Sequence, residues 1–356
     1  MPDDTRPGFA PLQSPVESPP AQGTALEIAP GILWMRLPLP MALDHVNVYA
    51  LDEGDSWTLI DTGIASRRSR ALWADLLAGP LGGKPIARVL VTHHHPDHVG
   101  LAGWFMEQFG CELLMTRTAW LMARMLQLDE QNRPAPETLA FWHRNGMDPH
   151  LLEQRKAERP FNFADTVAPL PLGFTRIAEG DVLTLGERSW TVRIGNGHAP
   201  EHATLWCEED GLVLGGDQLL ATISPNLGVY VTEPDADPVS DWLESCERFK
   251  AFAREDHLVL PGHKLPFTGL PMRLRQLADN HHSALQRLEA FLSEPRRAPE
   301  TFPLLFKRTI SDQTYGLAFV EAVAHLNHLH KAGRISRRAD ENGVWLWQAP
   351  QSGAPK

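Results

Sequence analysis

Four candidate metal ligands fall within six consecutive residues of this 356-residue chain: His93, His95, Asp97 and His98. The segment follows an apolar run typical of a buried strand and precedes an amphipathic run, 99–109, typical of a helix. His93 and His95 can point the same way from an extended turn, whereas Asp97 and His98 can point to either side of a cleft. The spacing favours two neighbouring metal clusters over one tetrahedral site. A His-rich surface loop would not need the flanking strand and helix.

Three further motifs each follow an apolar run later in the chain: Gly197-His198, Gly216-Asp217 and Pro261-Gly262-His263. An aspartate at the end of an apolar strand is costly to bury unpaired, and metal cations would supply the pairing. The H-x-H-x-D-H string and these motifs, in this order, resemble the signature of the metallo-β-lactamase-fold hydrolases. The resemblance covers roughly residues 25–270.

The resemblance implies two divalent metal ions, zinc in the first instance, with iron and manganese as alternatives because histidine and carboxylate accept all three. It implies a metal-ligand set shared between the two ions: His93, His95 and His198 for the first, Asp97, His98 and His263 for the second, and Asp217 between them. The Asp61-Thr62-Gly63 string resembles the family's first motif, in which the aspartate lies near the metals without binding them. His202 is interpreted as an orienting partner of a ligand; the alternatives are a substrate-facing group and an ordinary polar residue at a strand start.

The reaction class that the resemblance implies is hydrolysis by a metal-bound hydroxide, with Asp97 as the catalytic residue that orients the attacking water. His95 stands where the redox di-iron branch of the fold has glutamate, and Asp217 stands where antibiotic-degrading members have cysteine. Both redox chemistry and β-lactam hydrolysis are therefore disfavoured. We expect an ester, thioester or lactone hydrolase, similar to glyoxalase II or the lactonases. The alternatives are an endoribonuclease or phosphodiesterase and a non-catalytic binding protein.

The order of predicted elements is α/β: strands at 31–37, 46–51, 57–61 and 87–91, helices at 66–77 and 99–109, and later strands up to 257–260. We expect a metallo-β-lactamase αβ/βα sandwich at 25–270, with a Pro-rich disordered tail at 1–24 and a short tail at 351–356. The tail prediction rests on six prolines in residues 1–24 without any periodicity.

A helical insertion is predicted at 117–165, where Trp, Met and Phe recur between prolines. If it covers the cleft as a cap, the substrate has an apolar portion; otherwise these side chains form the buried face of a subdomain. We predict a substrate pocket lined by residues of the insertion and of the loop after Asp217: Trp120, Met125, Trp142, Ser224 and Tyr230.

Residues 271–350 are predicted as two helices and a hairpin, which resembles the winged-helix appendix of one branch of the family. From Met272 on the chain carries a net charge of +4, against −15 for the remainder. Nucleic-acid binding is thus an alternative, but packing or a homodimer contact is at least as common a role for such a domain.

The bulk composition is that of a globular protein, with 43% hydrophobic and 22% charged residues. Three distant cysteines without a CxxC pair favour a reducing compartment, the cytoplasm. The first residues carry Asp3 and Asp4 and no apolar core of a signal peptide. No apolar run reaches the roughly 20 residues of a membrane span.

Overall fold

The computed structural model describes residues 11–306 and 309–350, which form two compact units. The first unit contains the described residues up to Glu130, Asn162–Pro225 and Phe249–Leu274. The second contains Gln131–Phe161, Asn226–Arg248 and the described residues from Arg275 on.

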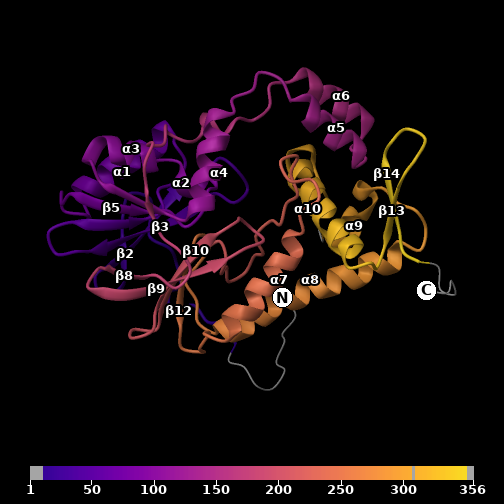
Figure 1. Ribbon diagram of the computed structural model, residues 1–356. Coiled ribbons are helices and arrows are strands. Elements are labelled where there is room, and N and C mark those ends of the chain that lie inside the picture. Colours follow the sequence, from indigo (N-terminus) through magenta and orange to yellow (C-terminus); the bar gives the residue numbers. More distant parts are fainter. Residues whose placement is uncertain (1–10, 307–308, 351–356) are drawn as a thin grey trace. The chain divides into compact units, whose positions relative to one another are not determined.

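Two sheets form the centre of the first unit (Figure 1). The larger sheet has seven strands in sequence order: β1 (Leu26–Ala29), β2 (Ile32–Pro38), β3 (His45–Asp52), β4 (Trp57–Ile60), β5 (Ile86–Leu90), β6 (Glu112–Met115) and β7 (Thr175–Arg176). The pairs from β1 to β4 are antiparallel and those from β4 to β7 are parallel. The parallel half therefore presents the carboxyl ends of β4, β5 and β6 at one edge.

The smaller sheet has five strands in the order β12-β11-β10-β9-β8. Its strands are β8 (Val182–Leu185), β9 (Arg188–Gly195), β10 (His202–Cys207), β11 (Leu212–Gly216) and β12 (Leu258–Pro261). Only the β11–β12 pair is parallel. Side chains of both sheets, among them Trp34 of β2, Trp190 of β9 and Leu260 of β12, share one buried core.

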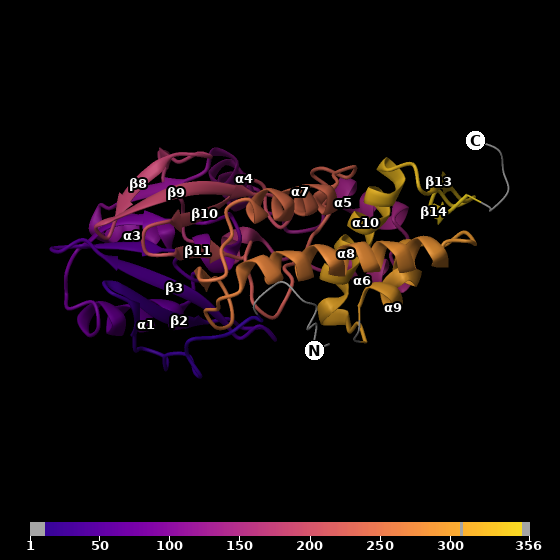
Figure 2. The same cartoon turned by 90° about the horizontal axis from the view of Figure 1, so that it is seen from below.

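Helices cover the outer face of the larger sheet (Figure 1), and Figure 2 shows the strands of the smaller sheet from below. They are α1 (Arg67–Ala78), α2 (Pro96–Val99), α3 (Ala102–Phe109) and α4 (Arg117–Leu128). In α1 the buried Ser69, Trp73 and Leu76 lie on one face, and Ser66 caps the helix by accepting a hydrogen bond from the Ser69 N–H. The outer face of the smaller sheet packs on Phe249 and Phe252 through Trp206. Helices packed on the larger sheet, and a core shared by the two sheets, confirm the predicted α/β sandwich.

The prediction of a disordered tail at 1–24 is wrong for residues 11–24. Gln13 exchanges backbone hydrogen bonds with Thr268, and Val16 packs against the core between the sheets. A Pro-rich segment can lie along a preformed core without regular structure, because a few apolar contacts and one bridge suffice to hold it. Residues 1–10 and the predicted tail at 351–356 lie outside the described residues.

The predicted helical insertion at 117–165 is divided between the two units. Helix α4 belongs to the first unit, where Ala119 and Ala123 enter the core and Trp120 stacks on Phe174. The other two helices, α5 (Pro136–Arg144) and α6 (Pro149–Ala157), belong to the second unit. The sequence pattern does not reveal this division, because α4 and α5 each carry an apolar face with a tryptophan and nothing in the sequence shows which core that face joins.

The second unit is mainly helical. Its remaining elements are most of α7 (Pro238–Lys250) and of α8 (Leu270–Phe291), together with η2 (Ala298–Thr301), α9 (Phe302–Leu305), α10 (Asp312–Lys331) and the hairpin of β13 (Ser336–Ala339) and β14 (Trp345–Gln348). The first unit further contains the short turn η1 (Phe163–Asp165). Helix α10 begins earlier than the expected Phe319, because Ser311 and Thr314 form a capping box. The hairpin matches the two strands expected from the sequence. The resemblance of this region to a winged helix stays a prediction.

Of the helices in the described residues, none combines the length and the apolar character that crossing a membrane requires.

A buried histidine pair in the second unit generates a pH prediction. The ring of His281 in α8 stacks on His325 in α10, with 3.1 Å between His281 Nδ1 and His325 Nε2. Burial, reinforced by His325 and the nearby His282 and His328, lowers the pKa of His281 to about 3. Below about pH 6.5 His281 is therefore protonated in the unfolded chain but not in the folded one. The unfolding free energy is not reduced by this residue above that pH, and it falls as the pH drops below it.

His281→Gln should reduce the loss of unfolding free energy between pH 7 and pH 5 by about 2 kcal/mol. Urea unfolding, followed by a spectroscopic signal from the second unit, measures the unfolding free energy at both pH values. The matched control is His282→Gln, whose side chain is exposed. An equal pH dependence in both variants would contradict this account.

Candidate metal centre

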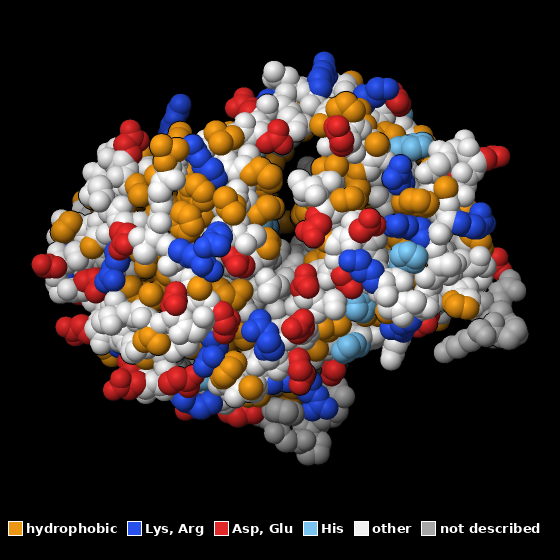
Figure 3. Space-filling model, in the orientation of Figure 1, with side chains coloured by type: hydrophobic (Ala, Val, Ile, Leu, Met, Phe, Trp, Pro, Cys, Tyr) orange, Lys and Arg blue, Asp and Glu red, His pale blue; other side chains and the backbone are white. Residues whose placement is uncertain are grey.

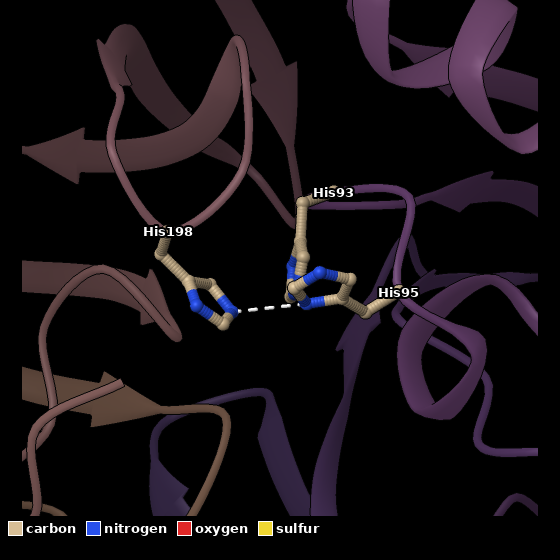
Figure 4. A group of neighbouring side chains, drawn as sticks. All are labelled: His93, His95 and His198. Atoms are coloured by element: carbon tan, nitrogen blue, oxygen red, sulfur yellow. Dashed lines mark hydrogen bonds between the residues drawn. The ribbon is translucent and has the colours of Figure 1, made fainter. Parts of the chain in front are cut away.

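Three imidazole rings converge at the carboxyl edge of the sheets (Figure 4). His93 and His95 lie in the turn after β5, and His198 lies in the loop between β9 and β10. His93 Nε2 is 2.9 Å from His95 Nδ1, which is 3.0 Å from His198 Nε2. Nitrogen lone pairs that face one another at such distances repel unless a proton or a cation lies between them. This trio, which we name the first cluster, could hold one metal ion.

Two carboxylates and two further imidazoles form a second cluster beside the first: Asp97, His98, Asp217 and His263. His263 Nε2 lies 3.3 Å from Asp97 Oδ2 and 3.2 Å from Asp217 Oδ2. His98 Nε2 lies 3.4 Å from Asp217 Oδ1. Asp217 Oδ2 is also 3.4 Å from His198 Nε2, so this carboxylate lies between the clusters. The structure thus brings together all seven residues that the resemblance implied as ligands.

The outward nitrogens of three rings are hydrogen-bonded, which decides the tautomers of two of them. His98 Nδ1 contacts Asp61 Oδ2 at 2.7 Å, and His263 Nδ1 contacts the His45 carbonyl at 2.8 Å. His93 Nδ1 lies 3.0 Å from Thr92 Oγ1. Because a carboxylate and a carbonyl only accept, Nδ1 of His98 and His263 carries the proton. Their Nε2 atoms then face the clusters, and in the neutral ring each offers a lone pair there, as a metal ligand requires.

Strand β3 holds the loop that carries His263. The amide of Asn47 and the hydroxyl of Tyr49 both donate to the Pro261 carbonyl, at 2.8 Å each. The Gly262 carbonyl accepts from the Asn47 N–H. A Cβ on Gly262 would lie 2.3 Å from Asp217 Oδ1, so only glycine allows this loop to approach the carboxylate.

Burial and mutual charge set the protonation of the metal-free centre. Burial opposes the charged form of His263, but the Asp217 carboxylate outweighs it and raises the pKa of His263 to about 10. Burial would raise the pKa of Asp217, yet the His263 and His98 rings hold it well below its usual range. Burial and the neighbouring rings keep the pKa of His93 and His95 well below the ordinary value. His93 and His95 are therefore neutral, and the second cluster is a compact set of ion pairs.

The donor set fits divalent metal ions. Two buried atoms of the described residues, His98 Nε2 and Asp217 Oδ1, make no hydrogen bond. A carboxylate oxygen is a strong acceptor, and an imidazole nitrogen normally either donates or accepts. Both atoms face the interior of the second cluster, and a cation there would satisfy them. Imidazole nitrogen and carboxylate oxygen are ligands that zinc, iron and manganese accept.

Asp61 and His202 both lie next to the ligands. Asp61 accepts hydrogen bonds from the Thr92 backbone and hydroxyl as well as from His98, so it orients two segments at once. The His202 ring stacks on His93 at 4.5 Å, and its Nε2 accepts a hydrogen bond from the Asp217 N–H at 3.1 Å. These contacts favour the interpretation of His202 as an orienting partner over the two alternatives.

The five expected pocket residues are not gathered in one unit. Trp120, Met125 and Ser224 belong to the first unit, and Trp142 and Tyr230 belong to the second. Trp120 is engaged with Phe174, and the Arg155 guanidinium lies over the Trp142 ring. Met125, Ser224 and Tyr230 are exposed. Contacts within the units thus assign Trp120 and Trp142 mainly to packing.

Sequence reasoning missed His45, whose carbonyl holds His263. A backbone oxygen leaves no signature in the side-chain pattern, and no motif surrounds Asp44-His45. Only the long-range pairing of β3 with the loop after β12 reveals this role.

Two family models match this chain. One, described as the metallo-beta-lactamase superfamily, matches residues 41–263, and the other, described as a metallo-beta-lactamase-like C-terminal domain, matches residues 285–350.

A probable metallo-hydrolase of Bacillus subtilis, YqjP, is 28% identical over 325 residues, 88% of this chain and 97% of that protein. The crystal structure of a beta-lactamase domain protein from Burkholderia ambifaria is 34% identical, with a TM-score of 0.86 over 95% of this chain and 98% of that one. A metallo-beta-lactamase family protein from Thermus thermophilus is 26% identical, with a TM-score of 0.76 over 91% of this chain and all of that one (100%).

Proposed function

This chain belongs to the metallo-beta-lactamase superfamily and is a metallo-hydrolase, and we propose that it cleaves an ester, thioester or lactone bond with the help of two divalent metal ions. The proposal rests above all on one observation: the ligand-rich centre adjoins a helix, α4, that exposes an apolar stripe. Zinc is the first expectation for the metal, and iron and manganese fit the same donors.

We propose that His93, His95 and His198 would hold the first ion and Asp97, His98 and His263 the second, with Asp217 between them. Seven ligand side chains exceed what one tetrahedral ion needs, which supports a pair. When bound, such a pair lowers the pKa of water and polarises a carbonyl oxygen.

Asp97 is proposed as the catalytic residue. Its side chain is 20% exposed, against 9% for Asp217, so it is the carboxylate of the centre that solvent reaches more readily. In the proposed reaction Asp97 orients water and takes its proton as the water oxygen bonds to the carbonyl carbon. The bond to the leaving oxygen or sulfur then breaks, and that atom receives the proton.

The apolar stripe on α4 supports an acyl substrate. Leu121, Met125 and Leu128 are 52%, 43% and 64% exposed and recur at the spacing of one helix face. Hydrophobic side chains gather over α4 on the visible surface of the first unit (Figure 3). The first turn of α4 is anchored to the loop of His198 by a hydrogen bond from the Thr118 N–H to the Glu201 carboxylate. An apolar acyl group would find a contact surface here.

Phosphodiester or RNA cleavage is the second candidate. The net charge of +4 from Met272 on is its supporting observation, but −15 in the remainder opposes the approach of a polyanion to the centre. The acyl substrate is therefore favoured.

His263→Ala should lower the metal content from two ions to one per chain. The variant removes a donor of the second cluster only and leaves the first intact. Elemental analysis of metal-saturated protein measures the stoichiometry, and wild-type saturation at one ion would contradict the dinuclear proposal.

The substrate class is tested with a panel of thioesters, esters, lactones, phosphodiesters and RNA. We expect turnover of the acyl substrates to vary little with salt, whereas RNA binding would weaken steeply. Preferential cleavage of RNA by the wild type would transfer the assignment to the second candidate.

Asp97→Asn should lower kcat by about 100-fold or more with a small change in KM.

Met125→Ala should flatten the preference for longer acyl chains. Each methylene buried against the stripe contributes about 0.8 kcal/mol, roughly a fourfold preference per carbon. The readout is kcat/KM across a series of acyl lengths, and Leu172→Ala, at a side chain that is 85% exposed, is the control. If both variants keep the wild-type preference, the stripe does not contact the substrate.

A further inference from the structure

Glu201 lies between the ligand candidate His198 and its neighbour His202, and it makes three hydrogen bonds in three directions. Its N–H donates to Asn196 Oδ1 at 2.8 Å, within the same loop. Its carbonyl accepts from the Thr116 hydroxyl at 2.7 Å, and its carboxylate accepts from the Thr118 N–H at 2.6 Å. The loop between β9 and β10 is thereby closed on itself and fastened to the start of α4.

The carboxylate occupies a favourable position at the helix. Thr118 is in the first turn of α4, where backbone N–H groups have no partner within the helix. A negative charge there also meets the positive end of the helix dipole. Thr116, the N-cap residue, makes no side-chain bond to its own helix, and its hydroxyl is used for the Glu201 carbonyl instead.

Helix α4 is a rigid support for this attachment. Ala119 and Ala123 are buried in the core under the seven-stranded sheet, and Trp120 stacks on Phe174 at 4.7 Å. The Arg124 guanidinium donates to the Leu170 carbonyl at 2.8 Å. A loop fastened to α4 is therefore fixed relative to the seven-stranded sheet.

The attachment matters because the histidines of the first cluster come from loops of both sheets. His93 and His95 follow β5 of the larger sheet, whereas His198 follows β9 of the smaller one. The loop of His263, the other long-range histidine, is fastened to the larger sheet through Asn47, Tyr49 and the His45 carbonyl. Glu201 makes the equivalent connection for the loop of His198.

Glu201 adopts a backbone conformation that costs free energy, with φ of 50°. Left-handed backbone is unfavourable for a residue with a side chain, because the Cβ crowds the following carbonyl oxygen. Glycine would avoid that cost but could not reach Thr118. The side chain at this position thus performs a task that the turn itself does not require.

We propose that Glu201 is a positioning residue for metal binding at the first cluster: it holds His198 at the distance from His93 and His95 that one ion requires. This inference rests on the proposed function, since it takes His198 as a ligand. Loss of a group that orients a metal ligand typically weakens metal binding by about 10- to 100-fold.

The experiment measures the affinity of metal-free protein for each of two Co²⁺ ions by chelator competition, together with the visible absorption of the bound ions. Glu201→Ala should lower the affinity for one Co²⁺ ion by about 10- to 100-fold and alter the absorption of that ion. The affinity and absorption of the other ion should change little. Glu201→Gln keeps an acceptor for the Thr118 N–H and should restore most of the affinity. A purely structural role would lower thermal stability without changing either ion.

Glu187→Ala is the matched control, because Glu187 is also a glutamate with positive φ, 62°, and lies in the exposed β8–β9 turn. It should bind both ions as the wild type does. Wild-type affinity and absorption in Glu201→Ala would overturn the inference. If that variant fails to fold, Glu201→Asp decides: it keeps the charge, but its carboxylate is one methylene short of the Thr118 N–H, and an unchanged affinity for both ions would overturn the inference equally.

His198→Ala separates this inference from the proposed function. If His198→Ala leaves both affinities unchanged, the ligand assignment itself is wrong. If His198→Ala loses one ion while Glu201→Ala retains it, the ligand assignment stands and only the positioning role fails.

Discussion

Buried charge at Asp217 is the constraint on which the rest of the structure depends. Its carboxylate lies within 3.4 Å of three imidazoles, which come from the turn after β5, the loop after β9 and the loop after β12. A carboxylate without partners in this position would cost several kcal/mol. The two sheets must therefore meet at a fixed separation and register, and the core between them, with Trp34, Trp190 and Leu260, sets that separation.

Hydrogen bonds at two points convert this packing into a defined centre. On one side the His45 carbonyl, Asn47 and Tyr49 hold the loop of His263; on the other, Glu201 holds the loop of His198. In both cases a polar group near the larger sheet secures a loop of the smaller one. Apolar packing alone determines distance loosely, because side chains adapt, whereas hydrogen bonds at about 2.8 Å do not.

The candidate ligands could be located in the sequence because their spacing is local. Four lie within six residues, and each of the other three follows an apolar strand, so pattern and chemistry coincide; the structure brings the seven side chains together. Asp61 and His202 were accessible through their places in the motif series. His45 and Glu201 were not, since one acts through a backbone oxygen and the other through a helix that lies more than 80 residues away in the chain. The same limit applies to Gln13, which pairs with Thr268, and to α5 and α6, whose partners, such as Phe319 for Phe141, lie far along the chain.

Left-handed backbone gathers around the centre. Among the described residues, four non-glycine residues have positive φ, and three of them, Asp61, Glu201 and Lys264, adjoin the ligands. Glycine at such a position removes roughly 1–2 kcal/mol of strain and adds about 0.5–1 kcal/mol of unfolded-state entropy. At Lys264, whose contacts with Asn47 and His45 come from its backbone, thermal stability therefore gives little reason to keep the side chain. A search for thermostable variants would select Lys264→Gly. That substitution would raise the melting temperature and make the loop that carries His263 less rigid.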